Sequence, residues 1–484
     1  MASQLLATKS IDELQAQEAS GNELRRALTA TQLTLLGIGG VIGTGIFVLT
    51  GVAAAQNAGP ALALSFIFAG IGCMFAGLCY AEFAAMIPVS GSAYSYSYAT
   101  LGEGIAWFIG WNLILEYLFA VATVSVGWSG YAVSLLDQLH VHIPDALSHA
   151  PFDQDRLTEH MVRTGAIINV PAMLIVAAIA TICYIGIKQS ATFNSWIVTI
   201  KVTVIILFIM FGISFINTAN WHPFVPPNEG HFGEFGWSGV LKAAGVIFFA
   251  YIGFDAISTA AQEAKNPQRD MPIGILASLV ICTILYVIVA TVLTGMVSYK
   301  ELNVAAPVAL ALDKYPGLHW LGIPIKLGAV AGMTSVMLVM TIAQARIFFA
   351  MARDGLLPKF FGKVHPKFRT PSTGTVVTGV TAAIIGGLFP VGVLGHLVSI
   401  GTLAAFVTVC IGVLVLRKTR PDLPRPFRTP LPWFTCLAGA GVCGLMMVSL
   451  GAATWWRLAI WTVFGVAVYV LYGRKHSRLH RAGT

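Results

Sequence analysis

Long apolar runs, separated by short polar stretches, follow one another along nearly the whole chain after about residue 30. A run of about 20 apolar residues is long enough to cross the hydrocarbon core of a bilayer as a helix. The pattern therefore predicts an all-α integral membrane protein with about twelve transmembrane helices. We place them at residues 33–55, 61–87, 104–136, 166–186, 192–216, 239–261, 273–297, 323–351, 373–390, 394–416, 432–450 and 454–472.

Composition supports this interpretation. Hydrophobic residues make up 56% of the 484 positions and charged residues 10%, whereas an average soluble domain carries about 25% charged residues. We divide the chain into a polar N-terminal segment (1–30), a membrane core (31–416), two accessory helices (417–472) and a C-terminal tail (473–484).

The distribution of Lys and Arg predicts the orientation. About 20 of these residues fall in the loops on the side of the N-terminus and about six on the other side, and cytoplasmic loops carry the excess of positive charge. We therefore expect a multi-pass protein of the cell inner (cytoplasmic) membrane with both termini in the cytoplasm. The net charge of +8 follows from this topology, so it gives no reason to expect a nucleic acid partner.

No pattern predicts a metal, a cofactor or an enzyme. The seven cysteines all lie within apolar runs and form no CxxC pair, which is typical of small packing residues. Catalysis would need a nucleophile and a base, or a metal cluster, at one depth of the membrane, and we find none in the sequence.

The stretch "GIGGVIGTGIFVLTG", from Gly37 to Gly51, holds six glycines, although an interior glycine costs a helix about 1 kcal/mol relative to alanine. A dinucleotide-binding loop would need a preceding strand and a soluble helix, which this apolar context does not provide. Two interpretations stay open: close helix packing through Gly39 and Gly43, or a break in the helix that frees N–H groups to bind an anion. A second glycine within a span, Gly253 in "GVIFFAYIGFDAISTAAQEA", favours the break, because secondary transporters interrupt corresponding helices of two repeats.

Four motifs carry a family resemblance: the glycine stretch, "PVSGSAYSYSY" (88–98), "FFAYIGFDAISTAAQEAKNPQRDMPIGI" (248–275) and "ARIFFAMARDGLLP" (345–358). Together they resemble the amino acid-polyamine-organocation transporter superfamily, in particular bacterial relatives of the cationic amino acid transporters. The resemblance implies a LeuT-like fold, in which helices 1–5 and 6–10 form an inverted repeat, helices 1 and 6 are discontinuous, and two C-terminal helices follow. Animal members of this branch carry two further C-terminal spans that this chain lacks.

The resemblance also implies an L-amino acid substrate held by the backbone at the two breaks. Its α-carboxylate would meet the N–H groups of Gly43, Thr44 and Gly45. Its α-ammonium would meet the carbonyls of Val41, Phe249, Ala250 and Ile252. Met340 is placed beside the substrate side chain, where it would favour small neutral amino acids over cationic ones, although core packing is the commoner use of methionine.

Three ionisable side chains in the spans, Lys201, Asp255 and Glu116, are candidates for substrate binding, coupling or gating, because a charge within the membrane is costly unless it is paired or solvated. Phe254, next to Asp255, is a fourth candidate. Lys201 stands alone in "WIVTIKVTVIILFIM", and by resemblance it would couple transport to protons by losing and regaining one as the site opens. The alternative is a lysine that snorkels or caps backbone carbonyls permanently. Asp255 would either hold the break in shape or attract a cationic substrate. Phe254 and Glu116 are candidate gating residues, with core packing and a polar network between helices as the respective alternatives.

The expected function is import of L-amino acids, cationic or small neutral, with proton symport by alternating access. An amino acid exchanger or a polyamine transporter of the same fold is the alternative. The coupling ion is a proton and no cofactor is expected. The other partners are membrane lipids, and the sequence leaves open both a small accessory membrane protein and a homo-oligomer.

Overall fold

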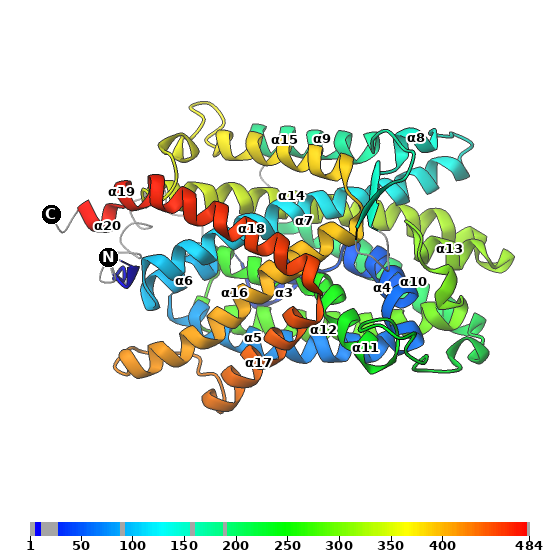
Figure 1. Cartoon of the computed structure of the whole chain (residues 1–484), viewed down its shortest axis with the longest axis horizontal. Coiled ribbons are helices and arrows are strands. Elements are labelled where there is room, and N and C mark those ends of the chain that lie inside the picture. Colours follow the sequence, from blue (N-terminus) through cyan, green and yellow to red (C-terminus); the bar gives the residue numbers. More distant parts are fainter. Residues whose placement is uncertain (1–4, 11–27, 88–91, 155–159, 187–190, 482–484) are drawn as a thin grey trace.

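The structure, a computed structural model, describes residues 5–10, 28–87, 92–154, 160–186 and 191–481. Long helices lie side by side along one axis of the molecule, and the two termini lie at the same end (Figure 1). Among the described residues, nine helical segments are long and apolar enough to cross a membrane, and three further apolar helices are shorter. The prediction of a helical membrane protein is confirmed.

Each of the apolar runs predicted as spans contains helix. The helices of the first half are α3 (Ala30–Val41), α4 (Thr50–Ala53), α5 (Leu62–Met86), α6 (Ser92–Thr100), α7 (Glu103–Gln138), α8 (Asp145–Ser148), α9 (Val170–Ile185) and α10 (Ala191–Gly212). Those of the second half are α11 (Gly236–Ile247), α12 (Pro267–Met296), α13 (Pro307–Asp313), α14 (His319–Arg353), α15 (Ser372–Leu388), α16 (Val391–Thr419), α17 (Pro432–Ser449), α18 (Ala452–Val468), α19 (Arg474–His476) and α20 (Arg478–Arg481).

The first apolar run is broken in the middle. Helix α3 begins at a capping box, in which Thr29 and Gln32 satisfy each other's backbone N–H groups. It ends at Val41, because Ile42 adopts an extended conformation with ψ 104°. The chain becomes helical again with a π-helical turn, Gly45–Leu49, that leads into α4.

The sixth apolar run is broken as well. Helix α11 passes into a 3-10 turn, Phe248–Tyr251, and Ile252 is extended with ψ 135°. Gly253 has φ +117°, in a region that residues with a side chain rarely adopt. A second 3-10 segment, Asp255–Glu263, continues the run.

The two breaks pack directly on each other, which explains the unusual glycine content. A Cβ on Gly253 would lie 2.7 Å from the carbonyl carbon of Gly40, and a Cβ on Gly45 would overlap the Cα of Ala250. The predicted break is present, whereas packing through the pair Gly39 and Gly43 stays a prediction, because the close backbone contacts lie at Gly40, Gly45 and Gly253. The helix is broken, and its glycines also permit close backbone approach.

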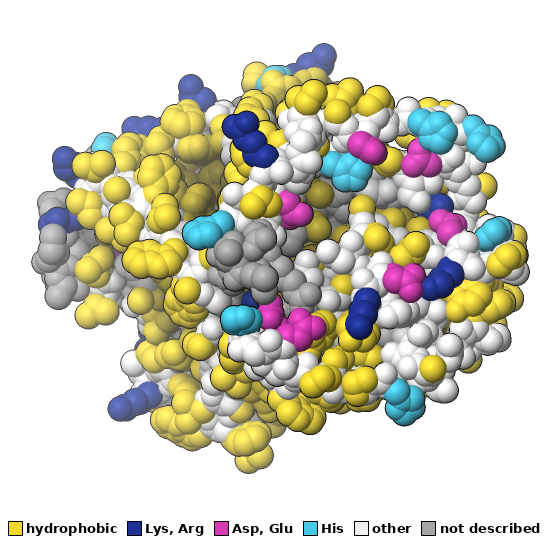
Figure 2. Space-filling model, turned by 45° about the vertical axis from the view of Figure 1, so that its right-hand side comes forward, with side chains coloured by type: hydrophobic (Ala, Val, Ile, Leu, Met, Phe, Trp, Pro, Cys, Tyr) yellow, Lys and Arg dark blue, Asp and Glu magenta, His cyan; other side chains and the backbone are white. Residues whose placement is uncertain are grey.

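A short antiparallel hairpin, β1 (Phe152–Gln154) paired with β2 (Met161–Arg163), was not predicted from the sequence. In Figure 2 the end of the molecule that carries α8 and α13 is turned toward the viewer. Asp, Glu and His side chains lie on this end. Hydrophobic side chains cover much of the remaining visible surface. This distribution fits a protein whose sides face lipid and whose ends face water.

Candidate functional site

A small cavity lies where the two breaks face α7 and α14. It is lined by Gly40, Val41, Gly43, Thr44, Gly45, Ala120, Val124, Phe249, Ile252, Val336 and Met340. The structure therefore brings most of the predicted substrate-binding residues together, whereas Ala250 and Asp255 lie outside this lining.

The backbone N–H groups at the first break are free. Within the described part of the chain, those of Gly43, Thr44 and Gly45 donate to no acceptor, whereas those of Ile46 and Phe47 donate to the carbonyl of Gly43 at 3.2 and 3.3 Å. The free groups stand at the start of the second half-helix, where the helix dipole adds a partial positive charge. A carboxylate is the kind of group that such a site binds.

Thr44 adds a side-chain donor beside these groups. It is fully buried, and among the described residues its hydroxyl has no hydrogen-bond partner. Its side chain lies against α7, because a Cβ on Gly127 would be 2.9 Å from the Thr44 hydroxyl oxygen. A buried hydroxyl without a partner is costly, so a bound polar group would stabilise it.

The predicted ammonium-binding carbonyls are partly occupied by a residue that the sequence did not indicate. The Tyr286 hydroxyl, on α12, lies 2.9 Å from the carbonyl oxygen of Val41 and 3.0 Å from that of Ala250. The carbonyl of Phe249 accepts the N–H of Ile252 at 3.2 Å. Each carbonyl oxygen has two lone pairs, so these contacts leave room for an additional donor.

Asp255 ties the second break to α7. Its carboxylate accepts a hydrogen bond from the Tyr117 hydroxyl at 2.7 Å and another from the Gly253 N–H at 3.3 Å. The side chain is fully buried. These contacts favour the structural alternative, in which Asp255 holds the broken segment in shape.

The two predicted gating residues lie outside the cavity lining. Phe254 packs edge-on against Tyr80, with ring centroids 5.7 Å apart, and is tilted against Phe406 at 5.1 Å. Glu116 precedes Tyr117 on α7 and is 1% exposed, and its Oε1 has no hydrogen-bond partner among the described residues. Their part in gating stays a prediction.

Lys201 binds the end of α3. Its Nζ donates to the carbonyl oxygens of Gly39 at 2.7 Å and Ile42 at 3.0 Å. These carbonyls belong to the C-terminal end of a half-helix, where the helix dipole favours a positive charge. The lysine is fully buried, and its stem packs on Gly332 of α14. It therefore joins α3, α10 and α14, and proton coupling through it stays a prediction.

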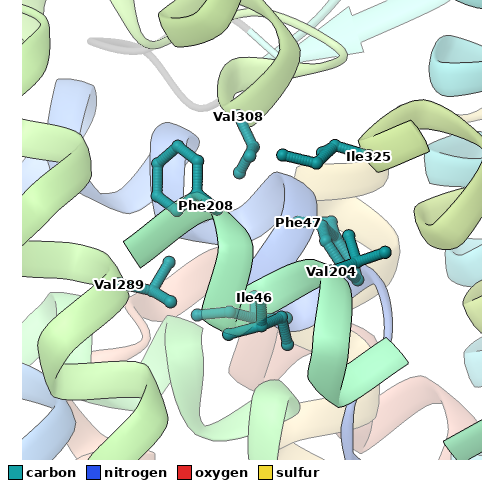
Figure 3. A pocket seen from close by; sticks show the side chains of 8 residues that line it. Ile46, Phe47, Val204, Phe208, Val289, Val308 and Ile325 are labelled. Atoms are coloured by element: carbon teal, nitrogen blue, oxygen red, sulfur yellow. The ribbon is translucent and has the colours of Figure 1, made fainter. Parts of the chain in front are cut away.

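A second cavity is lined in part by the π-helical turn (Figure 3). It is lined by Ile46, Phe47, Val204, Ile205, Phe208, Val289, Val308 and Ile325. Because all of these side chains are apolar, they offer no hydrogen-bonding group to orient a polar substrate.

Tyr286 and four of the cavity residues were not predicted from the sequence: Gly40, Ala120, Val124 and Val336. A tyrosine in a long apolar run does not reveal which way its hydroxyl points. Alanine and valine are ordinary residues of membrane helices, so only the rotation of α7 and α14 distinguishes those that face the cavity.

Comparison with known proteins places the chain in a family. The profile of the amino acid permease family matches residues 28–469. The chain is 49% identical over 479 residues to the methylthioribose transporter of Bacillus subtilis (strain 168), with 99% of the chain and 100% of that protein covered. It is 47% identical over 475 residues to the branched-chain amino acid permease BcaP of the same organism, with 98% of each covered. It is 36% identical over 419 residues to the vacuolar cationic amino acid transporter 4 of Arabidopsis thaliana, with 86% of the chain and 68% of that protein covered. The chain therefore belongs to the amino acid permease family, whose members are transporters and not enzymes.

Proposed function

We propose that this chain is a secondary transporter that imports L-amino acids with a proton, by alternating access, across the cytoplasmic membrane. We further propose an inverted repeat of helices 1–5 and 6–10, with both termini in the cytoplasm. The observation that carries the proposal is the cavity lined by residues of both breaks, where Gly43, Thr44 and Gly45 have backbone N–H groups without an acceptor among the described residues. Groups of opposite polarity suit the two charges of an amino acid.

The lining of the cavity favours a neutral substrate side chain. None of the described residues that line it carries a charged side chain, and Thr44 alone contributes a polar one. Burying a cationic side chain without a partner is strongly unfavourable. We therefore propose neutral amino acids over arginine, lysine or a polyamine.

A relative named for methylthioribose requires a second candidate. A sugar would need hydrogen-bond partners for its hydroxyl groups, and among the described lining residues the Thr44 hydroxyl is the sole side-chain group of that kind. Competition by methylthioribose against a labelled neutral amino acid tests this candidate. Strong competition by the sugar, with none by amino acids, would replace our proposal.

The proposed coupling depends on the charge of Lys201. A ligand shifts a conformational equilibrium only if its affinity differs between the two states. A charged Lys201 holds two carbonyls of the first break, and loss of its proton would weaken that hold. Proton occupancy would thereby favour one arrangement of α3 over the other.

The test is uptake by proteoliposomes that carry a pH gradient. We expect Lys201→Ala to abolish uphill accumulation while leaving exchange of internal for external substrate measurable. Lys326→Ala is the matched control, because Lys326 is also buried but binds Gln138 and Asp313 away from the break. Undiminished accumulation by Lys201→Ala would contradict the coupling.

The same vesicles separate import from exchange. If the wild-type protein takes up substrate only when substrate is already inside, and ignores the pH gradient, then the chain is an exchanger. The proposal expects uptake into empty vesicles that follows the proton gradient.

A further inference from the structure

We infer that Thr50 and Tyr131 are positioning residues for the anion site, the free N–H groups of residues 43–45. They hold the π-helical turn Gly45–Leu49 in the shape that directs these N–H groups toward the substrate carboxylate. Neither side chain lines the substrate cavity. The inference rests on the proposed function and deepens it, because it names residues outside the cavity on which recognition of the carboxylate depends.

The turn contains one residue more than an α-helical turn. The backbone N–H of Thr50 donates to the carbonyl of Gly45, five residues earlier, whereas an N–H in an α-helix donates to the carbonyl four residues earlier. Such π-helical turns are rare, and they occur frequently at functional sites. One residue of an α-helix corresponds to a rotation of about 100°. Loss of the extra residue would therefore rotate the chain on one side of the turn relative to the other by about this angle.

The segment after the turn cannot take up this rotation. A Cβ on Gly51 would lie 2.5 Å from the carbonyl oxygen of Leu302, and a Cβ on Gly59 would lie 2.6 Å from the ring of Pro226. Rotation would bring residues with side chains to these points of contact, where only glycine fits. The change would therefore fall on the segment before the turn, which contains the anion site.

The hydroxyl of Thr50 favours the π-helical form. It donates to the same carbonyl of Gly45 at 3.0 Å, whereas a threonine hydroxyl in an α-helix bonds a carbonyl three or four residues earlier. Thr50 is fully buried, so water does not replace this hydrogen bond if the turn changes shape. The hydroxyl thus stabilises the arrangement that contains the extra residue.

Tyr131 holds the turn from α7. Its hydroxyl donates to the carbonyl of Phe47 at 2.8 Å, and its ring lies edge-on to the ring of Phe47 with centroids 5.9 Å apart. About one turn earlier on α7, Gly127 lies against the side chain of Thr44. The same face of α7 therefore contacts both the turn and the anion site, and it fixes the position of one relative to the other.

Packing alone does not fix the turn, because the apolar cavity lies beside it. Ile46 and Phe47, both in the turn, line this cavity together with Phe208 of α10 (Figure 3). Protein interiors are normally close-packed, whereas here the side chains of the turn have space into which they can move. The hydrogen bonds from Thr50 and Tyr131 are therefore needed to keep the turn in one shape.

Amino alcohols test the inference, because they keep the ammonium and the side chain of an amino acid but lack its carboxylate. The probes are L-alanine with L-alaninol and L-leucine with L-leucinol. For each pair, the experiment measures the inhibition constants of the acid and of the alcohol against uptake of the radiolabelled acid by proteoliposomes. The ratio of the two constants is the preference for the carboxylate. A general change in packing would alter both constants and leave this ratio unchanged.

We expect Thr50→Val to lower the preference about tenfold or more, because a hydrogen bond to a charged group contributes at least about this factor. Thr50→Ser keeps the hydroxyl and should retain the wild-type preference. Thr294→Val is the matched control, because the Thr294 hydroxyl is also buried but donates to the carbonyl of Ala290 within α12. This control should leave the preference unchanged.

Tyr131→Phe should lower the preference in the same direction, because the carbonyl of Phe47 loses the donor that holds it to α7. This variant tests the inference if Thr50→Val does not fold. A monodisperse elution profile shows which variants are folded.

The outcomes separate this inference from the proposed function. If the wild-type protein takes up neither amino acid, or does not prefer the acid to the alcohol, the proposed function fails. If the wild-type protein has the preference and the folded Thr50→Val and Tyr131→Phe variants keep it, the positioning role fails and the proposed function stands. An equal loss of preference in Thr294→Val, or in Thr50→Ser, would also overturn the positioning role.

Discussion

At the scale of single residues, Tyr286 is the most informative side chain. Its hydroxyl reaches one carbonyl from each break, those of Val41 and Ala250. Ring contacts with Phe66 and Tyr251, at centroid distances of 5.4 and 5.6 Å, hold the side chain in place. A hydroxyl has one hydrogen to donate, so it cannot fully satisfy both carbonyls. A substrate ammonium has three hydrogens, so it would supply the hydrogen bond that the Tyr286 hydroxyl cannot give to both carbonyls.

Tyr286→Phe tests this role of the hydroxyl. Removing the hydroxyl leaves two buried carbonyls without a donor from this side chain, at a cost of about 1–3 kcal/mol. We expect a lower melting temperature without substrate and a larger substrate-induced rise than in the wild-type protein. The measurement is a thermal shift with and without a saturating neutral amino acid.

The control for this prediction is Tyr251→Phe. The Tyr251 hydroxyl donates to the Phe66 carbonyl at 2.9 Å, in the same aromatic group but without touching Val41 or Ala250. Tyr251→Phe should lower the melting temperature and leave the substrate-induced rise in melting temperature unchanged. Equal rises in the two variants would contradict a role for Tyr286 at the ammonium site.

At the scale of elements, the contact between the two breaks depends on glycine. A side chain at residue 45 would collide with the backbone of Ala250, and backbone cannot rotate away as a side chain can. Gly253 also needs its positive φ. Because Gly45 and Gly253 carry no β-carbon, the backbones of the two breaks can lie in direct contact.

Gly45→Ala should therefore destabilise the protein by at least about 1–3 kcal/mol, the usual range for an overpacked core, and should abolish transport. Gly441→Ala is its control. Gly441 lies within α17, and a Cβ added there would have nothing within 4 Å. Alanine is favoured over glycine inside a helix by up to about 1 kcal/mol, so this control should be neutral or stabilising. Full transport by Gly45→Ala would show that the breaks do not need to touch.

The sequence predicted where the helices lie along the chain, but it did not predict which side of each helix faces the cavity. Apolar runs mark helices because backbone groups in lipid must be satisfied within the segment, and glycine at residues 43, 45 and 253 indicated the breaks. Nothing in the sequence placed Val124 and Val336 in the cavity, because the helices have apolar residues on every side. The β1–β2 hairpin lies in a polar connection without a clear alternating pattern, so it too escaped prediction.

At the scale of the whole molecule, the two ends of the chain meet at the end of α14. Lys9 Nζ lies 2.7 Å from Asp354 Oδ1, and both side chains are buried. The Tyr94 hydroxyl donates to the same carboxylate at 2.7 Å. The backbone N–H of Arg478 donates to the carbonyl of Asp354 at 3.0 Å. Lys9 and the C-terminal helices thus pack together at the end of α14.

The central claim is that exposed backbone groups at two breaks hold the charged ends of an amino acid. The most direct measurement is a cryo-electron microscopy map of the protein saturated with a neutral aliphatic L-amino acid. We predict density in the cavity with the carboxylate against the N–H groups of Gly43, Thr44 and Gly45, and the ammonium facing Val41 and the second break. A map in which both runs are continuous helices, or in which the ligand lies elsewhere, would contradict the account.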